Sequence, residues 1–87
     1  MVSVRHEVLL KAPDGSEHVL EQGTSYYSLA ARPNAYAHQW LAAGKLPNGT
    51  PVLGATQQQQ AFRLETPQGT YVVRLRSIYL GGAAARL

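Results

Sequence analysis

Residues 33–47 carry the only long helical pattern in the chain, so the rest of the fold must be arranged around this segment. Its large apolar residues recur four and then three positions apart, which puts them on one stripe of a helix. The stripe is formed by Tyr36, Trp40 and Ala43, with Ala37 and Leu41 beside them. Gly44 and Pro47 mark the helix end, because glycine adopts a left-handed conformation and proline cannot continue the hydrogen bonding. We therefore expect one central helix whose stripe faces the core.

The segment before this helix leaves more than one arrangement open. Pro33 suits the first turn of a helix, whereas Asn34 would cap a helix that begins one residue later. Either start predicts a break near residues 32–34. Residues 25–32 could themselves form a short helix, which would make the middle of the chain a helix, a tight turn and a second helix. The candidate caps of the short helix are Thr24 and Ser25.

Alternating apolar and polar residues predict an N-terminal β-hairpin. Residues 2–11 alternate as a half-buried strand does, and residues 12–16 contain a proline and a glycine that favour a tight turn. If Ala12 pairs with Ser16, the apolar face of the hairpin stays continuous. The expected pairs are Lys11 with Glu17, Leu10 with His18 and Val8 with Leu20. The solvent face would hold Ser3, Arg5, Glu7 and Lys11.

A second antiparallel hairpin is predicted at the C-terminal end. Residues 61–66 and 71–76 alternate around residues 67–69, and residues 77–80 extend the second strand. A loop of even length puts the large apolar side chains on one face, whereas a loop of three residues would mix them with arginines. The inner face would hold Phe62, Leu64, Tyr71, Val73 and Leu75. The outer face would hold Arg63, Arg74 and Arg76.

Two segments lack such patterns. Residues 54–60 include four consecutive glutamines with little to bury, which indicates a loop of uncertain order. Residues 81–87 begin with two glycines, which end the strand, and are expected to form a loose tail. The sequence therefore predicts an α+β fold with an N-terminal β-hairpin, a central helix or helix-turn-helix, and a C-terminal β-hairpin, the helix covering one sheet face.

Length and composition exclude several classes of protein. The 87 residues make a single small domain near the lower limit for a self-sufficient core, so a monomer or a weak homodimer is expected. The chain has no cysteine, which excludes disulfides and thiolate metal sites. No apolar stretch is long enough to cross a bilayer, so we expect a cytoplasmic protein without a membrane partner.

No residue set predicts catalysis, a metal site or a cofactor. The three histidines and five acidic residues form no recognised motif, and no glycine-rich phosphate loop follows a strand. His6 and His18 share the inner face of the first hairpin but do not face each other in the expected register, which favours a structural role over a metal site. We therefore expect a non-enzymatic protein that needs no cofactor.

Charge is distributed unevenly along the chain. Residues 1–31 carry two basic and four acidic residues, a net charge of −2, whereas residues 32–87 carry six basic residues and one acidic residue, a net charge of +5. Three of these arginines share the outer face of the C-terminal hairpin, where Glu65 can compensate only one of them. This pattern favours an anionic partner such as a phosphate group. A charged strand face that only discourages aggregation would look the same.

Five tyrosines in so short a chain suit a protein interface. Tyr36 and Tyr71 have the spacing of core residues. Tyr26 and Tyr27 are adjacent in the expected short helix, so at least one of them must be exposed, close to Arg32. Together with a β-edge, these residues would suit a protein-binding inhibitor or adaptor, for example one of phage type that blocks a host or defence complex.

Several short segments carry a family resemblance: Ser28 to Ala31, Ala37 to Pro47, Pro51 to Gly54 and Phe62 to Leu64. Over residues 28–64 they resemble small winged-helix regulators of the excisionase and AlpA type, which phages and mobile elements encode. The resemblance implies a second helix that enters the major groove and a wing that follows it. It also implies phosphate contacts from the hairpin arginines. The groove contacts that it implies are Asn34, Tyr36, His38 and Gln39.

Two functions stand as hypotheses. The first is a small DNA-binding accessory protein of phage or mobile-element type that contacts phosphates through its basic C-terminal hairpin. The second is the protein-binding inhibitor or adaptor. The residues expected to contact DNA or an acidic protein surface are Arg32, His38, Gln39, Lys45, Arg63, Arg74 and Arg76.

Overall fold

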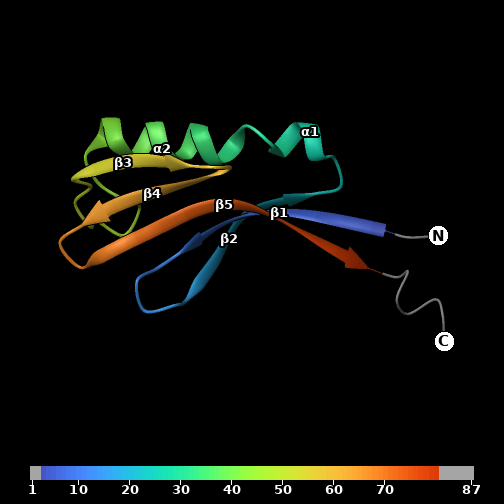
Figure 1. The fold of residues 1–87 in the computed structure, drawn as a ribbon, viewed down its shortest axis with the longest axis horizontal. Helices are drawn as coiled ribbons and strands as arrows, with labels where there is room; N and C mark the ends of the chain where they lie inside the picture. The colour runs from blue at the N-terminus through green and yellow to red at the C-terminus, as the bar shows by residue number, and fades with distance from the viewer. Residues whose placement is uncertain (1–2, 81–87) are drawn as a thin grey trace.

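The computed structural model describes residues 3–80 and has a mixed α+β fold, which confirms the predicted class (Figure 1). Five antiparallel strands form one sheet in the order β2-β1-β5-β4-β3, and two helices lie over one face of it. The strands are β1 (Ser3–Lys11), β2 (Glu17–Gly23), β3 (Gly54–Gln58), β4 (Ala61–Thr66) and β5 (Gly69–Leu80). The helices are α1 (Tyr26–Leu29) and α2 (Arg32–Ala43).

Helix α2 ends where its sequence predicts. Gly44 caps it in the left-handed conformation, with a φ of 78°, and donates its N–H to the carbonyl of Trp40 at 2.8 Å. The carbonyl of Gly44 then accepts the N–H of Val52, and Leu46 between them is buried. The helix end therefore folds the following segment back onto the core.

The start of α2 agrees with one of the two arrangements that the sequence left open, the one with Pro33 in the first turn. The helix begins at Arg32, after the N-cap Ala31, so the break predicted near residues 32–34 comes slightly earlier, at residues 30–31, and the alternative in which Asn34 is the cap is wrong. Pro33 lies in the first turn, where its missing N–H is not needed, and it is buried. Burial of this ring against the core decided between starts that the local sequence left open.

Helix α1 is a single turn before this start. The hydroxyl of Ser25 caps it by accepting the N–H of Ser28 at 3.3 Å. Leu29 is its buried residue, and residues 30–31 separate it from α2. The expected helix, tight turn and helix are present, although the first helix has four residues and ends sooner than predicted.

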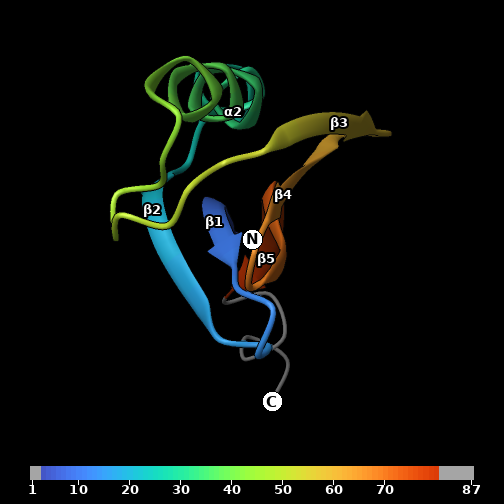
Figure 2. The same ribbon diagram turned by 90° about the vertical axis from the view of Figure 1, so that its left-hand side faces the viewer.

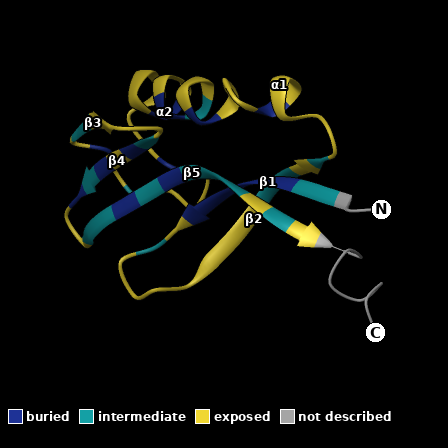
Figure 3. Cartoon of the chain, turned by 45° about the vertical axis from the view of Figure 1, so that its right-hand side comes forward, coloured by how far each residue is buried: buried dark blue, intermediate teal, exposed yellow. Residues whose placement is uncertain are grey.

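The core lies between α2 and the sheet, and Figure 2 shows α2 end-on above the strands. Trp40 is 4% exposed, which confirms that the central helix packs on the sheet. The buried line of α2 runs through Pro33, Ala37 and Trp40. Leu41 and Ala43, expected in or beside the stripe, are exposed. Figure 3 shows buried residues on α2 and along β1, β4 and β5. The cluster comprises Val8, Leu10, Leu29, Ala37, Trp40, Leu46, Val52, Phe62, Leu64, Tyr71 and Val73.

The first hairpin follows its expected register for only half its length. The confirmed pairs are Lys11 with Glu17 and Leu10 with His18. A β-bulge follows, so Val8 faces Glu21 instead of Leu20. The extra residue turns Glu21 toward the helices, where an alternating strand without a bulge would have placed it on the other face.

Strand β1 is central in the sheet, because β5 pairs with it along its whole length. Glu7 is therefore 4% exposed and Leu9 is fully buried, so the expectation that Glu7 lies on a solvent face is wrong. The C-terminal part of the chain is not a separate hairpin. It is a twelve-residue strand, β5, that pairs with β4 on one side and with β1 on the other.

Strands β4 and β5 are joined by a two-residue loop at residues 67–68, in agreement with the predicted even length. The inner-face residues Phe62, Leu64, Tyr71 and Val73 are buried as expected, and Leu75 packs against them. The loop predicted at residues 54–60 is wrong, since residues 54–58 form the edge strand β3 on β4. Backbone pairing defines this strand, while most of its polar side chains remain in solvent.

Two further expectations concern the ends of the chain and its environment. The tail predicted at residues 81–87 lies outside the described residues. Within residues 3–80, neither helix has the length and apolar character needed to cross a membrane.

Candidate interaction surfaces

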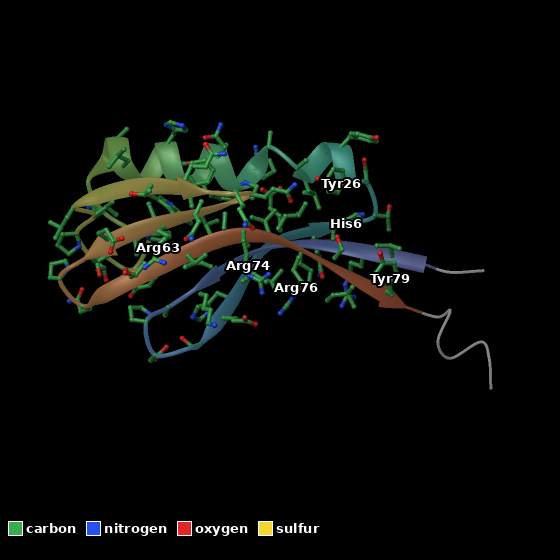
Figure 4. All side chains as sticks on the ribbon, viewed as in Figure 1. His6, Tyr26, Arg63, Arg74, Arg76 and Tyr79 are labelled. Carbon is green, nitrogen blue, oxygen red and sulfur yellow. The ribbon has the colours of Figure 1, made fainter. Side chains whose placement is uncertain are left out.

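The sheet face opposite the two helices holds the three predicted hairpin arginines, and we call it the open face. Figure 4 shows Arg63, Arg74 and Arg76 along β4 and β5. The strand register puts them on the face opposite the core, as the sequence predicts. The open face comprises Arg5, Glu7, Leu9, Lys11, Glu17, Val19, Arg63, Glu65, Val72, Arg74, Arg76 and Ile78.

Arg76 is held by two carboxylates of the first hairpin. Its Nη2 donates to Glu7 Oε1 at 2.8 Å and its Nη1 donates to Glu17 Oε1 at 2.9 Å. These bonds, that of Glu7 first, raise the pKa of Arg76. Arg5 Nε lies 3.5 Å from the same buried Glu7. The expectation that only Glu65 is available, and only for one arginine, is therefore wrong, because the first hairpin brings two further acidic groups, Glu7 of β1 and Glu17 of β2, to Arg76.

Arg63 and Arg74 are held less tightly by ion pairs than Arg76 is. Arg63 Nε is 3.9 Å from Glu65 Oε2, and both side chains are about half exposed. Arg74 makes no ion pair with any residue between positions 3 and 80. The charge that an anion could use on the open face therefore comes mainly from these two arginines and from Lys11, which is exposed and makes no ion pair among the described residues.

On the helix side, Arg32 is engaged by Glu21. Arg32 Nε donates to Glu21 Oε2 at 2.7 Å, and the Tyr36 hydroxyl donates to the same oxygen at 2.7 Å. The Tyr36 hydrogen bond first, and then that of Arg32, lowers the pKa of Glu21. The guanidinium carbon also lies 5.4 Å from the centre of the Tyr36 ring. This cluster fastens α2 to β2, so both residues have structural partners.

The predicted contact residues do not form one site. His38 and Gln39 are exposed on α2, and Lys45 is exposed directly after it. The sheet separates α2 from the open face, so one flat partner could not contact both groups. The group on or after α2 is Arg32, His38, Gln39 and Lys45. The group on the open face is Arg63, Arg74 and Arg76.

Three tyrosines are exposed where β5 ends, and we call this group the tyrosine end (Figure 4). Tyr26, Tyr27 and Tyr79 are 40%, 90% and 72% exposed. Tyr26 packs edge-on against His6, with ring centres 5.5 Å apart, and against Tyr27 at 5.6 Å. His6 Nδ1 and Ser77 Oγ lie 2.7 Å apart in a hydrogen bond. Aromatic area thus reaches solvent beside the last residues of β5.

The same end carries a strand edge without a partner. β4 pairs with residues 69–73 of β5, whereas β1 pairs with residues 72–80. Within the described part of the chain, no strand pairs with residues 74–80 on their β4 side, which we call the free edge. Figure 1 shows β5 and β1 running together past the first residue of β4.

The backbone direction along the free edge follows from the sheet hydrogen bonds. The carbonyl of Glu65 accepts the N–H of Leu53, so it points away from β5. The backbone groups of successive residues point to alternate sides of a strand. The N–H and C=O of Leu64 therefore point toward β5, and those of its partner Tyr71 point toward β4. The β5 register with β1 is continuous, so the alternation extends to the end of the strand. The residues whose N–H and C=O point out of the free edge are Leu75, Ser77 and Tyr79.

A pocket of about 250 Å³ opens at the start of the free edge, on the helix side of the sheet. It lies between the helices, the turn after β3, and β5. Its lining includes Tyr26, Pro33, Gln60, Phe62 and Leu75. A side chain of a strand laid along the free edge would enter this pocket if it stood opposite Leu75 and pointed to the helix side.

No family model, curated protein or solved structure matches this chain. The surfaces above therefore have to be interpreted from their own geometry. Within residues 3–80, no group of three or more metal-binding side chains comes together. His6 faces Gly23 and His18 faces Leu10, at opposite ends of the first hairpin.

Sequence reasoning did not find the free edge, although a signal for it was present. The predicted strand at residues 61–66 is six residues long, whereas the strand that follows the turn continues to residue 80. A hairpin with one arm twice as long as the other leaves half of the longer arm without that partner. The pocket carries no such signal, because its lining comes from both helices and from three different strands.

Proposed function

We propose that this chain is a non-enzymatic protein-binding module that receives an extended segment of its partner at the free edge of β5. The observation that carries the proposal is the seven-residue stretch 74–80, unpaired on one side, with three residues whose backbone groups point outward. In strand addition, backbone hydrogen bonds supply affinity and the flanking side chains supply specificity. The tyrosine end lies beside this edge and offers the aromatic area that is enriched at interfaces.

The two outer strands of the sheet suit this role less well. β3 has five residues, and its polar side chains protect it as an edge. β2 contains the bulge, and its Glu17 and Glu21 are engaged in ion pairs within the molecule. The free edge has no bulge, and Tyr79 beside it is largely exposed. It is therefore the edge that another chain could extend most readily.

The test is selection of binding peptides from a displayed random library against the immobilised wild-type protein. Selected peptides should lose binding to a Tyr27→Ala, Tyr79→Ala double variant, because Tyr79 belongs to the free edge and Tyr27 packs against Tyr26, which lines the pocket at the start of that edge. A matched control, Leu41→Ala with Leu53→Ala, also removes two exposed apolar side chains, 42% and 69% exposed, but leaves this end intact. Peptides that bind the tyrosine double variant as well as the wild type would contradict the proposal.

Binding of DNA or another polyanion on the open face is a second candidate function. It is favoured by Arg74, which has no ion pair among the described residues, and by the loose pair of Arg63. It would make the chain a DNA-binding accessory protein of the kind that the winged-helix resemblance implies. The net charge of +3 would favour such a partner at low salt.

A salt titration with a fluorescent DNA duplex tests this second candidate. Binding should weaken as salt rises, with a log–log slope of about −0.9 for each phosphate contact. The variant pair Arg63→Glu and Arg74→Glu should abolish binding, and the control Lys45→Glu should not. Arg76 is left unchanged, because its removal would strand the buried carboxylate of Glu7. Absence of binding even at low salt would eliminate the candidate.

A further inference from the structure

We infer that the segment received at the free edge is β5 of a second copy of this chain, paired antiparallel about a two-fold axis at Ser77. The inference rests on the proposed function and names its partner. Ser77 is the midpoint of the seven-residue free edge, and its own N–H and C=O point outward. A two-fold axis there lets each copy present the same residues to the other.

The backbone pattern is self-complementary in this register. Leu75 of each copy faces Tyr79 of the other, and Ser77 faces Ser77. All three residues point their backbone groups across the interface, so each facing pair can exchange two hydrogen bonds, roughly six in total. The pairing uses residues 75–79 of each copy and stops before Arg74, because the β4 register places Ala61, the first residue of β4, beside Arg74.

Two-fold axes at the neighbouring residues would bring like charges together or would pair fewer of the residues whose backbone groups point outward. An axis at Arg76 would set two guanidinium groups directly opposite each other and would run into residue 73, which β4 already pairs. An axis at Ile78 would use only residues 76–80. With the axis at Ser77, Arg76 faces Ile78 and no arginine faces another. Avoiding repulsion between arginines and pairing the largest number of outward-pointing residues therefore both favour the axis at Ser77.

The pocket fits the side chain that this register delivers. Tyr79 is 72% exposed, and it points to the helix side of the sheet, as Leu75 does. In the dimer, Tyr79 of one copy stands opposite Leu75 of the other, at the mouth of the 250 Å³ pocket that Leu75, Phe62 and Tyr26 help to line. The dimer therefore contains two identical contacts, in each of which Tyr79 of one copy fills the pocket of the other. The two copies form one ten-stranded sheet, with all helices on the same face.

Single cysteines test the register, because the natural chain has none. In the dimer, the two Ser77 Cα atoms are about 5.5 Å apart, within the range of a disulfide, so Ser77→Cys should cross-link rapidly under mild oxidation. Tyr79→Cys is the control. Its Cα atoms would be roughly 14 Å apart, so it should cross-link slowly despite its greater exposure. Cross-linking of Tyr79→Cys as fast as that of Ser77→Cys would overturn the inference.

Sedimentation of proline and alanine variants tests the backbone pairing without cross-linking. Wild-type protein should shift from monomer to dimer as its concentration rises over about 1 µM to 1 mM. Ser77→Pro should remain monomeric, because it removes an N–H that points out of the sheet and spares the pairing with β1. Ser77→Ala loses the same hydroxyl but keeps the N–H, so it should dimerise. A wild-type protein that is monomeric at every concentration overturns the inference.

The two proposals fail in different ways. If the wild type is monomeric but selected peptides still bind the free edge, the second copy is not the partner and the proposed function stands. If the wild type is monomeric and peptides bind the tyrosine double variant equally well, both proposals fail. Loss of the dimer in Ser77→Pro, with an unchanged circular dichroism spectrum, supports both.

Discussion

Leu9 provides the sharpest test of how the open face is built. It is fully buried although no helix covers that face. By register it lies between Val19 of β2 and Arg74 of β5, with Glu7 next to it along β1 on the same face. Water must therefore be excluded by the aliphatic stems of long polar side chains, which lie over the leucine while their charged ends reach solvent. Truncation of Leu9 measures how well such a layer substitutes for a second hydrophobic layer.

The expected cost follows from the removed carbons and the space they leave. Leu9→Ala deletes three carbon groups worth about 0.8 kcal/mol each, close to 2.4 kcal/mol of transfer free energy. A residual cavity adds about 24 cal/mol per Å³, but mobile arginine stems can fill part of it, so we expect about 2.5–3.5 kcal/mol. Leu64 is equally buried but lies within the rigid helix–sheet core. Leu64→Ala should therefore lower the free energy of unfolding by about 3.5–5 kcal/mol.

Urea unfolding measures both variants, and the difference appears in the midpoint with an unchanged m value. Val19→Ala is the matched control. Val19 faces Leu9 on the neighbouring strand but is 47% exposed, so its truncation should cost below about 1 kcal/mol. If Leu9→Ala cost no more than Val19→Ala, the charged side chains would not exclude water from this face, and the account of its packing would be refuted.

Three further predictions concern the core, the acid stability and metal independence. Trp40→Ala should lower the free energy of unfolding by about 3–5 kcal/mol in the same assay, and full retention of stability would rule out the packing of α2 on the sheet. The lowered pKa of Glu21 means that its carboxylate stabilises the fold above its unfolded-state pKa and loses this effect as the pH falls through the folded-state pKa. Tyr36→Phe removes the first cause of that shift, so the urea midpoint of the variant should depend less on pH in this acidic range; an unchanged pH profile would contradict the role of the hydroxyl. A chelator should leave the melting temperature unchanged, because His6 is engaged by Ser77 and does not meet His18, and a drop of several degrees would point to a metal site.

The sequence alone was sufficient where a feature depends on residues close together in the chain. Gly44 ends α2 because its own backbone adopts the left-handed conformation, and the short loop at residues 67–68 joins its strands because an even length keeps both apolar faces aligned. The same alternation correctly placed Arg63, Arg74 and Arg76 on one face. Dihedral preferences and the two-residue period of a strand are local properties, so the order of residues determines them directly.

Only the tertiary structure decided which elements lie beside one another. Alternation assigns a residue to a face but does not say which strand is its neighbour, so the carboxylate of Glu7 could not be matched with Arg76, 69 positions away. The bulge at Leu20 and the pairing of polar β3 with β4 have the same origin, because both depend on packing and backbone bonding summed over the whole sheet. The free edge arises in this way too. β1 pairs with residues 74–80 while β4 does not, and that difference is a property of the assembled sheet.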